Sequence, residues 1–319
     1  MAHKTKNIII FGATGLIGEH ITNAIVSNKA DFGRLAIFTS QNTLQSKSDA
    51  IDKLKSQGVE VITGDLTSKS DINEALKGFD TVVSAVGRPV IHTQIQIVEL
   101  MDKHPDVKRF FPSEYGTDIE YDETSKDEKP HQQKLKVRAA LKQVKDLEYT
   151  YVVTGPYGDA DKGLYLSAAP PDDDDKRASF DVKRKRALLL GDGEGKISLT
   201  TMRDVGKLVV AAIKHPDASK NKALKVNSFT TTPKEIVAEF EKQTGDSWDI
   251  SYTSLDELKK LEQEAWDRGD PGAGPMTLRR IWTSGRTLYD HRDNDAIEME
   301  DGVESLESAV KQAIKVQTA

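Results

Sequence analysis

Short apolar runs alternate with amphipathic, helix-like segments through the first half of the chain. The runs have the length and β-branched content of buried strands, and the segments between them repeat apolar residues at helical spacing. The pattern predicts strands at 6–11, 35–39, 59–63, 81–85 and 107–111, and helices at 16–28, 48–56, 71–77 and 94–103. Such alternation with short connections favours a doubly wound parallel α/β sheet of the Rossmann type, whose ligands bind beyond the carboxyl ends of the strands.

A glycine-rich turn joins the first predicted strand to the first predicted helix. Gly12 permits the tight turn, Gly15 lets the backbone approach a pyrophosphate, and Gly18 lets the helix pack closely on the strand. The free N–H groups and the positive dipole end of the helix would hold the phosphates of a dinucleotide. Glycine-rich turns are common, but this one has the strand before it and the helix after it that dinucleotide binding requires. The predicted phosphate-binding residues are Gly12, Thr14, Gly15, Leu16, Ile17 and Gly18.

The second half of the chain is more polar, and its alternation is weaker. A helix is expected from Pro130, whose fixed φ suits a first helical position, to about Lys145, followed by a strand at 149–153. The acidic run at 170–176 is expected to be an exposed loop rather than a calcium site, because its carboxylates lack ligand spacing. Helices at 232–244, 255–268 and 303–314 suit a smaller C-terminal α/β lobe that closes over the cofactor. We expect a dinucleotide-binding domain at 1–157 and a substrate-binding lobe at 158–319, partly interleaved with it.

The end of the second predicted strand indicates which dinucleotide binds. Sheets of this kind that prefer NAD usually place an Asp or Glu there, to bind the ribose 2′-hydroxyl. No acid occurs at 39–43, where Thr39 and Ser40 could donate to a 2′-phosphate and Lys47 could add positive charge. We therefore predict NADP(H), although the same residues would form a polar turn in any case. Asp65, after the third strand, is expected to contact the adenine side or to cap the next helix.

Composition narrows the class of protein. The 319 residues carry a net charge of −6, which argues against general nucleic-acid binding. The absence of cysteine excludes disulfides, thiolate metal sites and cysteine nucleophiles. No apolar run has membrane-spanning length, and because the N-terminus leads directly into the first strand we expect no signal peptide. We expect a cytoplasmic globular protein with no membrane or nucleic-acid partner, either monomeric or homodimeric.

The Tyr-x-x-x-Lys pair of ordinary short-chain dehydrogenases is absent. Tyr121 has serine at the fourth position, and Tyr149 and Tyr151 fall in a strand. The helix after the fifth strand has Lys134 and Arg138 one turn apart on one face. The helix dipole and the like charge should both lower the pKa of Lys134, which makes it a candidate proton donor or acceptor near neutral pH. From spacing alone the alternative is favoured: two solvated charges on an amphipathic helix.

Several segments together resemble a known family. They are the glycine turn, 83–87 (Val-Ser-Ala-Val-Gly), 109–116 (Arg-Phe-Phe-Pro-Ser-Glu-Tyr-Gly), 134–138 (Lys-Leu-Lys-Val-Arg) and 149–151 (Tyr-Thr-Tyr). In them the chain is similar to the NmrA-like family. Within that family it resembles the isoflavone reductase, pinoresinol–lariciresinol reductase and phenylcoumaran benzylic ether reductase branch of atypical short-chain dehydrogenases. The resemblance is dense over 7–157 and thin beyond, and the chain looks closer to fungal isoflavone reductase-like proteins.

The resemblance implies an NADPH-dependent reductase of an aromatic or other small secondary metabolite. It implies that Lys134 replaces the usual catalytic tyrosine and assists a departing or accepting oxygen as general acid or base. The residues implied to flank the nicotinamide and its ribose are Ser84, Ala85, Val86, Pro112 and Ser113, with Gly155 and Pro156 on the floor of the site. Two departures matter. Plant members generally carry an arginine where this chain has Thr39, and the second half, which shapes the substrate pocket, matches poorly.

Two other functions stay open from the sequence. A non-catalytic NAD(P)-sensing regulator of NmrA type tends to lose the catalytic residue, so the retained Lys134 counts against it, whereas the poor match of the substrate lobe counts in its favour. A redox-neutral lyase or isomerase would use the bound cofactor structurally.

The remaining candidates give weak signals. The histidines are scattered without metal-ligand spacing, so no metal site is predicted. His131 could border the pocket, but an exposed position on the helix is favoured. Trp266, Trp282 and Tyr289 could cover an aromatic substrate, although packing in the core or the lobe is the default for such residues.

Overall fold

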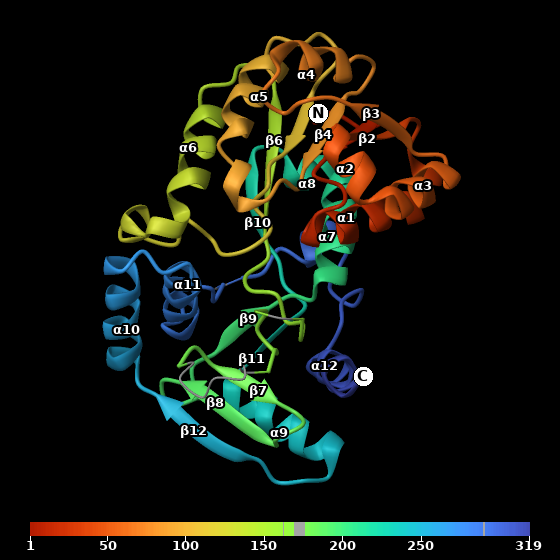
Figure 1. The fold of residues 1–319 in the computed structure, drawn as a ribbon. Coiled ribbons are helices and arrows are strands. Elements are labelled where there is room, and N and C mark those ends of the chain that lie inside the picture. The colour runs from red at the N-terminus through yellow and green to blue at the C-terminus, as the bar shows by residue number, and fades with distance from the viewer. Residues whose placement is uncertain (162, 169–175, 290) are drawn as a thin grey trace.

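The computed structural model describes residues 1–161, 163–168, 176–289 and 291–319. Its main element is a seven-stranded sheet in the order β10-β6-β5-β4-β1-β2-β3, with every neighbouring pair parallel (Figure 1). The strands are β1 (Ile8–Phe11), β2 (Leu35–Thr39), β3 (Glu60–Thr63), β4 (Thr81–Ser84), β5 (Arg109–Phe111), β6 (Glu148–Val153) and β10 (Lys222–Lys225). The predicted doubly wound Rossmann-type sheet is thus confirmed.

Helices cover both faces of the sheet because successive strand side chains point to opposite sides. Ile8 and Ile10 of β1 pack in one apolar cluster with α1 (Leu16–Ser27), α3 (Ser48–Ser56) and α7 (Met202–Lys214). Ile9 and Phe11 pack in a second cluster with α4 (Lys69–Ala75), α5 (Thr93–Met101) and α6 (Gln132–Leu141). The central strand is therefore buried on both sides, as a parallel sheet requires.

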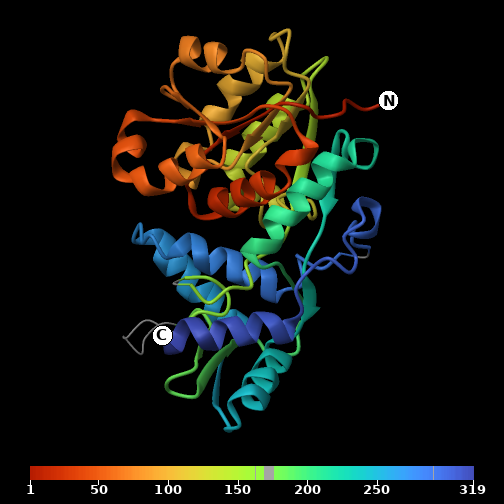
Figure 2. The same cartoon turned by 90° about the vertical axis from the view of Figure 1, so that its right-hand side faces the viewer.

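Most of the remaining chain forms the smaller lobe, drawn below the sheet in Figure 1. It has a three-stranded sheet of β7 (Ser179–Asp181), β8 (Arg186–Leu190) and β12 (Asp249–Thr253), and an antiparallel pair of β9 (Ile197–Leu199) and β11 (Phe229–Thr231). Two helices, α9 (Pro233–Thr244) and α12 (Leu306–Thr318), share its apolar core. Two others, α10 (Leu255–Asp267) and α11 (Ala273–Thr283), lie between this small sheet and the large one (Figure 2). The predicted C-terminal α/β lobe is confirmed as a fold.

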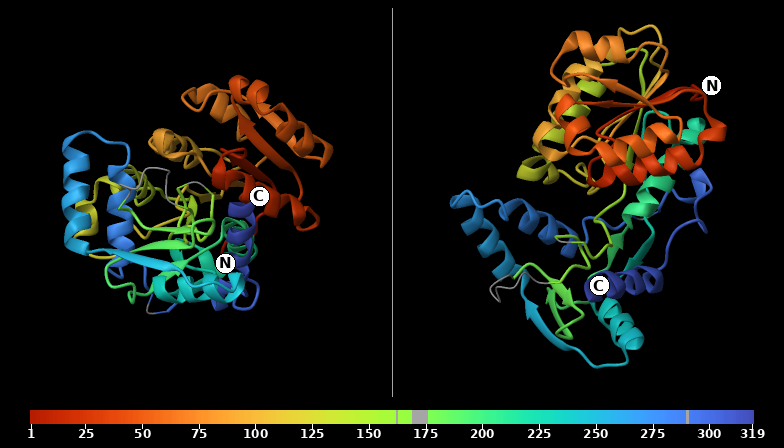
Figure 3. Two further views of the ribbon diagram at one scale, coloured as in Figure 1. Left: turned by 60° about the horizontal axis from the view of Figure 1, so that its bottom comes forward. Right: turned by 45° about the vertical axis from the view of Figure 1, so that its right-hand side comes forward.

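The chain crosses between the two parts more than once. Helix α7 packs on α1 so closely that a Cβ on Gly206 would lie 2.5 Å from the His20 carbonyl oxygen. Strand β10 then adds to the edge of the large sheet, with Leu224 opposite Val152 of β6. The boundary at 157/158 stays a prediction, but α7 and β10 both come from beyond it and belong to the large sheet (Figure 3).

Some local expectations differ from the structure. Residues 39–43 are not a simple turn, because the Ser40 side chain caps the short helix α2 (Gln41–Ser46). Pro130 lies in a 3₁₀ turn (Lys129–His131), and helix α6 begins only at Gln132 and ends at Leu141. Helices α7 and α11 were not expected. The loop expected at 170–176 lies outside the described residues, apart from its last residue, Lys176.

Candidate cofactor and active site

The glycine turn brings three backbone segments closer together than side chains would allow. Gly12 has φ +77°, and a Cβ on it would lie 2.6 Å from the Ala85 carbonyl oxygen at the end of β4. A Cβ on Gly18 would lie 2.0 Å from the Gly12 carbonyl oxygen. Gly15 is the N-cap residue of α1, and no side chain caps that helix. The start of α1 therefore presents backbone N–H groups, beside Leu16 and Ile17, to whatever lies beyond the strand ends.

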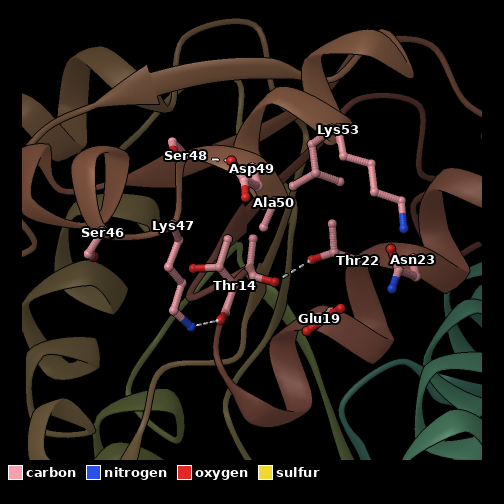
Figure 4. A pocket seen from close by; sticks show the side chains of 12 residues that line it. Thr14, Glu19, Thr22, Asn23, Ser46, Lys47, Ser48, Asp49, Ala50 and Lys53 are labelled. Atoms are coloured by element: carbon pink, nitrogen blue, oxygen red, sulfur yellow. Dashed lines mark hydrogen bonds between the residues drawn. The ribbon is translucent and has the colours of Figure 1, made fainter.

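A polar cavity of about 280 Å³ lies beside the glycine turn, between α1 and α3 (Figure 4). Thr14 and Lys47 both line it, and the Lys47 amine donates a hydrogen bond to the Thr14 carbonyl oxygen. The structure therefore brings Lys47 to the glycine turn, as an anion-binding role requires. Thr39 is buried in β2, and the Ser40 hydroxyl accepts from the Thr43 N–H as a helix cap.

Asp65 does not cap the helix that follows it. Its carboxylate accepts hydrogen bonds from the N–H and the hydroxyl of Thr67, both at 2.8 Å, and these bonds lower its pKa. The cap of α4 is Ser68, whose hydroxyl accepts from the Asp71 N–H. The capping alternative is thus wrong, and contact with an adenine stays a prediction for this exposed carboxylate.

A second cavity, of about 400 Å³, lies where the ends of β4, β5 and β6 face helix α11. It brings together most of the residues predicted around the nicotinamide, with Lys134 among them. The predicted residues in its wall are Leu16, Ile17, Val86, Ser113, Lys134, Gly155 and Pro156. Ser84, Ala85 and Pro112 are buried just behind this wall rather than in it. The lobe contributes Leu278 and Trp282 of α11.

Lys134 reaches into this wall from the first turn of α6. Its amine donates a hydrogen bond of 2.6 Å to the Glu114 carbonyl oxygen. Burial lowers the pKa of Lys134 to about 8; Arg88 and Arg138 act in the same direction, and the Glu114 carboxylate opposes them. The lowered pKa was expected from the helix dipole and Arg138, but the main cause is burial of the amine.

Arg138 is not the solvated charge that its spacing favoured, because its side chain is 2% exposed. Its guanidinium binds both carboxylate oxygens of Glu114, at 2.9 and 3.1 Å, and one oxygen of Glu120 at 2.8 Å. It also lies over the ring of Tyr151, with the guanidinium carbon 4.4 Å from the ring centre. Arg138 thus fixes the segment after β5 against α6, and with it the carbonyl that orients Lys134.

His131 is 1% exposed, so the expected exposed position is wrong. The 3₁₀ turn directs its ring inward, where Nδ1 lies 3.1 Å from the Ser125 carbonyl oxygen and the ring lines the same cavity as Lys134.

Trp282 also lines that cavity, and its indole N–H donates to the Thr117 hydroxyl at 2.8 Å. Trp266 packs between α10 and α11, donating to the Thr277 hydroxyl at 3.0 Å. Tyr289 is close to the floor, since its hydroxyl would be 3.8 Å from a Cβ on Gly155.

Sequence reasoning missed further residues of the cavity wall, among them Arg88, Tyr115 and Tyr157. Arg88 comes directly after the 83–87 motif at the end of β4, and Tyr115 lies inside the 109–116 motif. Tyr115 could have been found from the sequence by treating every position of the 109–116 motif as a possible residue of the cavity wall. Nothing in the local sequence shows that Arg88 faces the same space.

Two kinds of site are absent from the described part of the chain. No three His, Asp or Glu side chains there are grouped so as to hold a metal ion. None of the helices in the described ranges is long and apolar enough to cross a bilayer.

Comparison with known proteins extends over most of the chain. The sequence model of the NmrA-like family matches residues 4–268. An isoflavone reductase of Medicago sativa is 30% identical over 281 residues, which are 83% of this chain and 84% of the relative. A phenylcoumaran benzylic ether reductase of Pinus taeda is 28% identical over 265 residues, 80% of each protein. The solved complex of leucoanthocyanidin reductase with NADPH, from Vitis vinifera, has a TM-score of 0.79 and 21% identity, covering 97% of this chain and 99% of that one. These relatives come from plants, and the closer likeness to fungal proteins stays a prediction.

Proposed function

We propose that this chain, which belongs to the NmrA-like family, is an NADPH-dependent reductase of an aromatic or other small secondary metabolite. The family membership and the geometry of the cavity support this proposal. One observation carries the proposal: Leu16 and Ile17 of the glycine turn line the same cavity as Lys134. A hydride donor held by the turn and a proton donor on α6 would therefore meet one substrate.

The residues around the glycine turn fit a dinucleotide. The uncapped start of α1 and the close approach at Gly12 and Gly18 suit a pyrophosphate, and Lys47 supplies charge for a 2′-phosphate. Ser84, at the end of β4 just behind the cavity wall, has a buried hydroxyl without a partner among the described residues, and we propose it on the nicotinamide side of the site. When bound there, NADPH supplies a hydride. The other residues proposed beside the nicotinamide are Ala85, Val86, Pro112, Ser113, Gly155 and Pro156.

Lys134 is proposed to hold and transfer the proton. One of its three N–H bonds is directed to the Glu114 carbonyl, which leaves the others for an oxygen of the substrate. A pKa of about 8 keeps the amine mostly protonated at pH 7 yet able to release its proton, which is the range that general acid catalysis favours. The apolar side chains of α11 limit access of water, and Arg138 acts as a positioning residue.

Calorimetric titration with NADPH and NADH tests the cofactor site. We expect micromolar binding of NADPH and weaker binding of NADH by the unchanged protein. Lys47→Ala should weaken NADPH binding and leave NADH binding nearly unchanged, because the lysine serves the 2′-phosphate. Absence of binding of either nucleotide to folded protein would refute the reductase proposal.

Consumption of NADPH with a panel of isoflavones and lignans tests the chemistry. Lys134→Ala should lower kcat by about 10²–10⁴ with little change in NADPH affinity, because the lysine acts as the proton donor. Lys136→Ala, on an exposed position of the same helix, is the matched control and should be unaffected. NADPH binding with no turnover in any variant would instead favour the NAD(P)-sensing regulator.

A further inference from the structure

Two buried polar atoms in the cavity wall have no hydrogen-bond partner within the described residues. They are the hydroxyl of Tyr115 and Nε2 of His131, whose residues are 5% and 1% exposed. Both residues line the cavity that Lys134 lines. Buried polar groups nearly always have a partner, because a group that loses its hydration without replacement destabilises the fold. Two such groups in one cavity indicate that a ligand supplies their partners.

The contacts of His131 determine what its free nitrogen can bind. Nδ1 faces the Ser125 carbonyl oxygen, which can only accept, so Nδ1 carries the proton and Nε2 keeps its lone pair. The ring of Tyr121 packs edge-on against the imidazole, with 5.9 Å between ring centres, and limits its rotation. Burial lowers the pKa of His131; the hydrogen bond with Ser125 and the charge of Glu128 oppose this, and the neighbouring Lys134 and Arg88 reinforce it. The imidazole is therefore neutral at pH 7, and its Nε2 is a hydrogen-bond acceptor.

Tyr115 offers the complementary group. Its backbone carbonyl accepts a 2.5 Å hydrogen bond from the Tyr157 hydroxyl, and its ring belongs to the apolar cluster on one face of the sheet. The preceding residue, Glu114, is held by Arg138. Burial raises the pKa of Tyr115, so its phenol stays neutral and keeps an O–H to donate. The backbone and ring are thus fixed, while the hydroxyl is free to bind.

The charge of the wall limits what can enter. The described residues that line the cavity include Arg88, Lys134 and Arg279 but no Asp or Glu. A cationic ligand would gain no counter-charge there, whereas a neutral or anionic aromatic compound would be accommodated. The apolar residues of the wall include Trp282, Leu278 and Ile91, which suit an aromatic ring system.

We propose that Tyr115 and His131 are specificity-determining residues. Each forms a hydrogen bond with an oxygen-containing group of the substrate, and neither group is the oxygen that Lys134 protonates. A substrate hydroxyl donates to His131 Nε2, and a second substrate oxygen accepts from the Tyr115 hydroxyl. The substrate is therefore an aromatic compound with at least three oxygen functions. This inference rests on the proposed function and narrows its substrate class.

Thermal unfolding of the ligand-free protein tests whether the Tyr115 hydroxyl is free. Tyr115→Phe removes only the oxygen, so the unfolding midpoint should stay unchanged or rise, because an unpartnered buried hydroxyl does not stabilise the fold. A fall of several degrees would show that the hydroxyl has a structural partner, and would overturn its role in recognition.

Binding to the NADP⁺-loaded protein tests recognition. The probes are 4′,7-dihydroxyisoflavone and its dimethyl ether, titrated by quenching of tryptophan fluorescence. The dihydroxy compound should bind roughly tenfold more tightly to the unchanged protein, the size of one to two net hydrogen bonds. This ratio should fall in His131→Asn, since asparagine can keep the bond to Ser125 but has no acceptor at the Nε2 position. His131→Gln, which restores an acceptor there, should recover much of the ratio. Tyr115→Phe should weaken binding of both probes, because the oxygens of both can accept from the Tyr115 hydroxyl.

An equal affinity for the two probes in the unchanged protein, a ratio that His131→Asn does not alter, an affinity that Tyr115→Phe does not lower, or binding of neither probe would overturn the proposal. Calorimetry with NADPH on the same variants separates this failure from failure of the proposed function. If NADPH binding and Lys134-dependent turnover are retained, the proposed reductase function still holds. Only the proposed role of Tyr115 and His131 in substrate recognition is then refuted.

Discussion

At the scale of the residue, burial rather than the helix dipole sets the chemistry of Lys134. Because its pKa is lowered to about 8, the protonated form that donates to the substrate is lost as the pH rises through that value. We expect kcat/KM for NADPH oxidation to be level at neutral pH and to fall tenfold per pH unit above about 8. Lys134→Arg should lose most of the activity and also this alkaline fall, because a guanidinium keeps its proton. A profile that stays level to about pH 10 would contradict the assignment of Lys134 as the proton donor.

Arg138 is the second residue whose burial has a measurable effect. Arg138→Met would leave the Glu114 carboxylate buried without its partner, at a cost of about 3–5 kcal/mol in the free energy of unfolding. Urea denaturation measures this change, and adding Glu114→Gln should recover part of it by removing the unpaired charge. Lys142→Met is the control, since that lysine makes an exposed ion pair with Glu120 and should cost less than about 1 kcal/mol. A loss for Arg138→Met as small as the control's would show that the pair is not structural.

At the scale of the element, the junction of β1 and α1 tolerates no side chain at its third glycine. Gly18→Ala would place a Cβ 2.0 Å from the Gly12 carbonyl oxygen, so α1 must move away from the turn. We expect loss of NADPH affinity by at least tenfold and a lower unfolding midpoint, read by calorimetry and thermal melting. Gly274→Ala in α11 is the matched control, because a Cβ there meets nothing within 4 Å and alanine favours the helix. Equal behaviour of the two variants would contradict the close packing at Gly18.

Elements with a clear local pattern could be predicted from the sequence, and side chains that are buried by distant segments could not. Strand β2 is a short, continuous apolar run, and helix α3 has Ile51 and Leu54 at helical spacing, so both have the predicted bounds. Helix α7 was missed although its apolar residues repeat at helical spacing, so its signal was present in the sequence. His131 and Arg138 have ordinary helix-surface spacing, and only the folding of 114–128 over α6 buries them. The glycine turn and Lys134 were found because backbone conformation and motif are local, whereas the cavity wall depends on contacts between distant segments.

At the scale of the whole molecule, one arginine ties the lobe to the large sheet beside the cavity. Arg280 of α11 binds Glu128, before α6, at 2.7 Å and Glu262 of α10 at 2.5 Å. Arg280→Met should therefore loosen α10 and α11, raise KM for an aromatic substrate several-fold and leave NADPH affinity unchanged. Hydrogen exchange should become faster in α11. Lys259→Met, which replaces an exposed lysine of α10, is the control and should change neither KM nor hydrogen exchange. Unchanged hydrogen exchange in Arg280→Met would show that the ion pairs of Arg280 do not hold the lobe.

The large sheet cannot be completed on the ribosome until strand β10 has been translated. The strand that covers the edge of β6 is translated some 70 residues after β6 itself, together with the α7 helix that packs on α1. At about 5–20 residues per second, the nascent sheet keeps an open edge for roughly 4–14 s. Open edges recruit other strands, so the nascent chain is most prone to aggregate in this interval. We expect the yield of native protein to depend on nascent-chain chaperones and on the rate of translation between residues 153 and 225 more than on the stability of the finished fold.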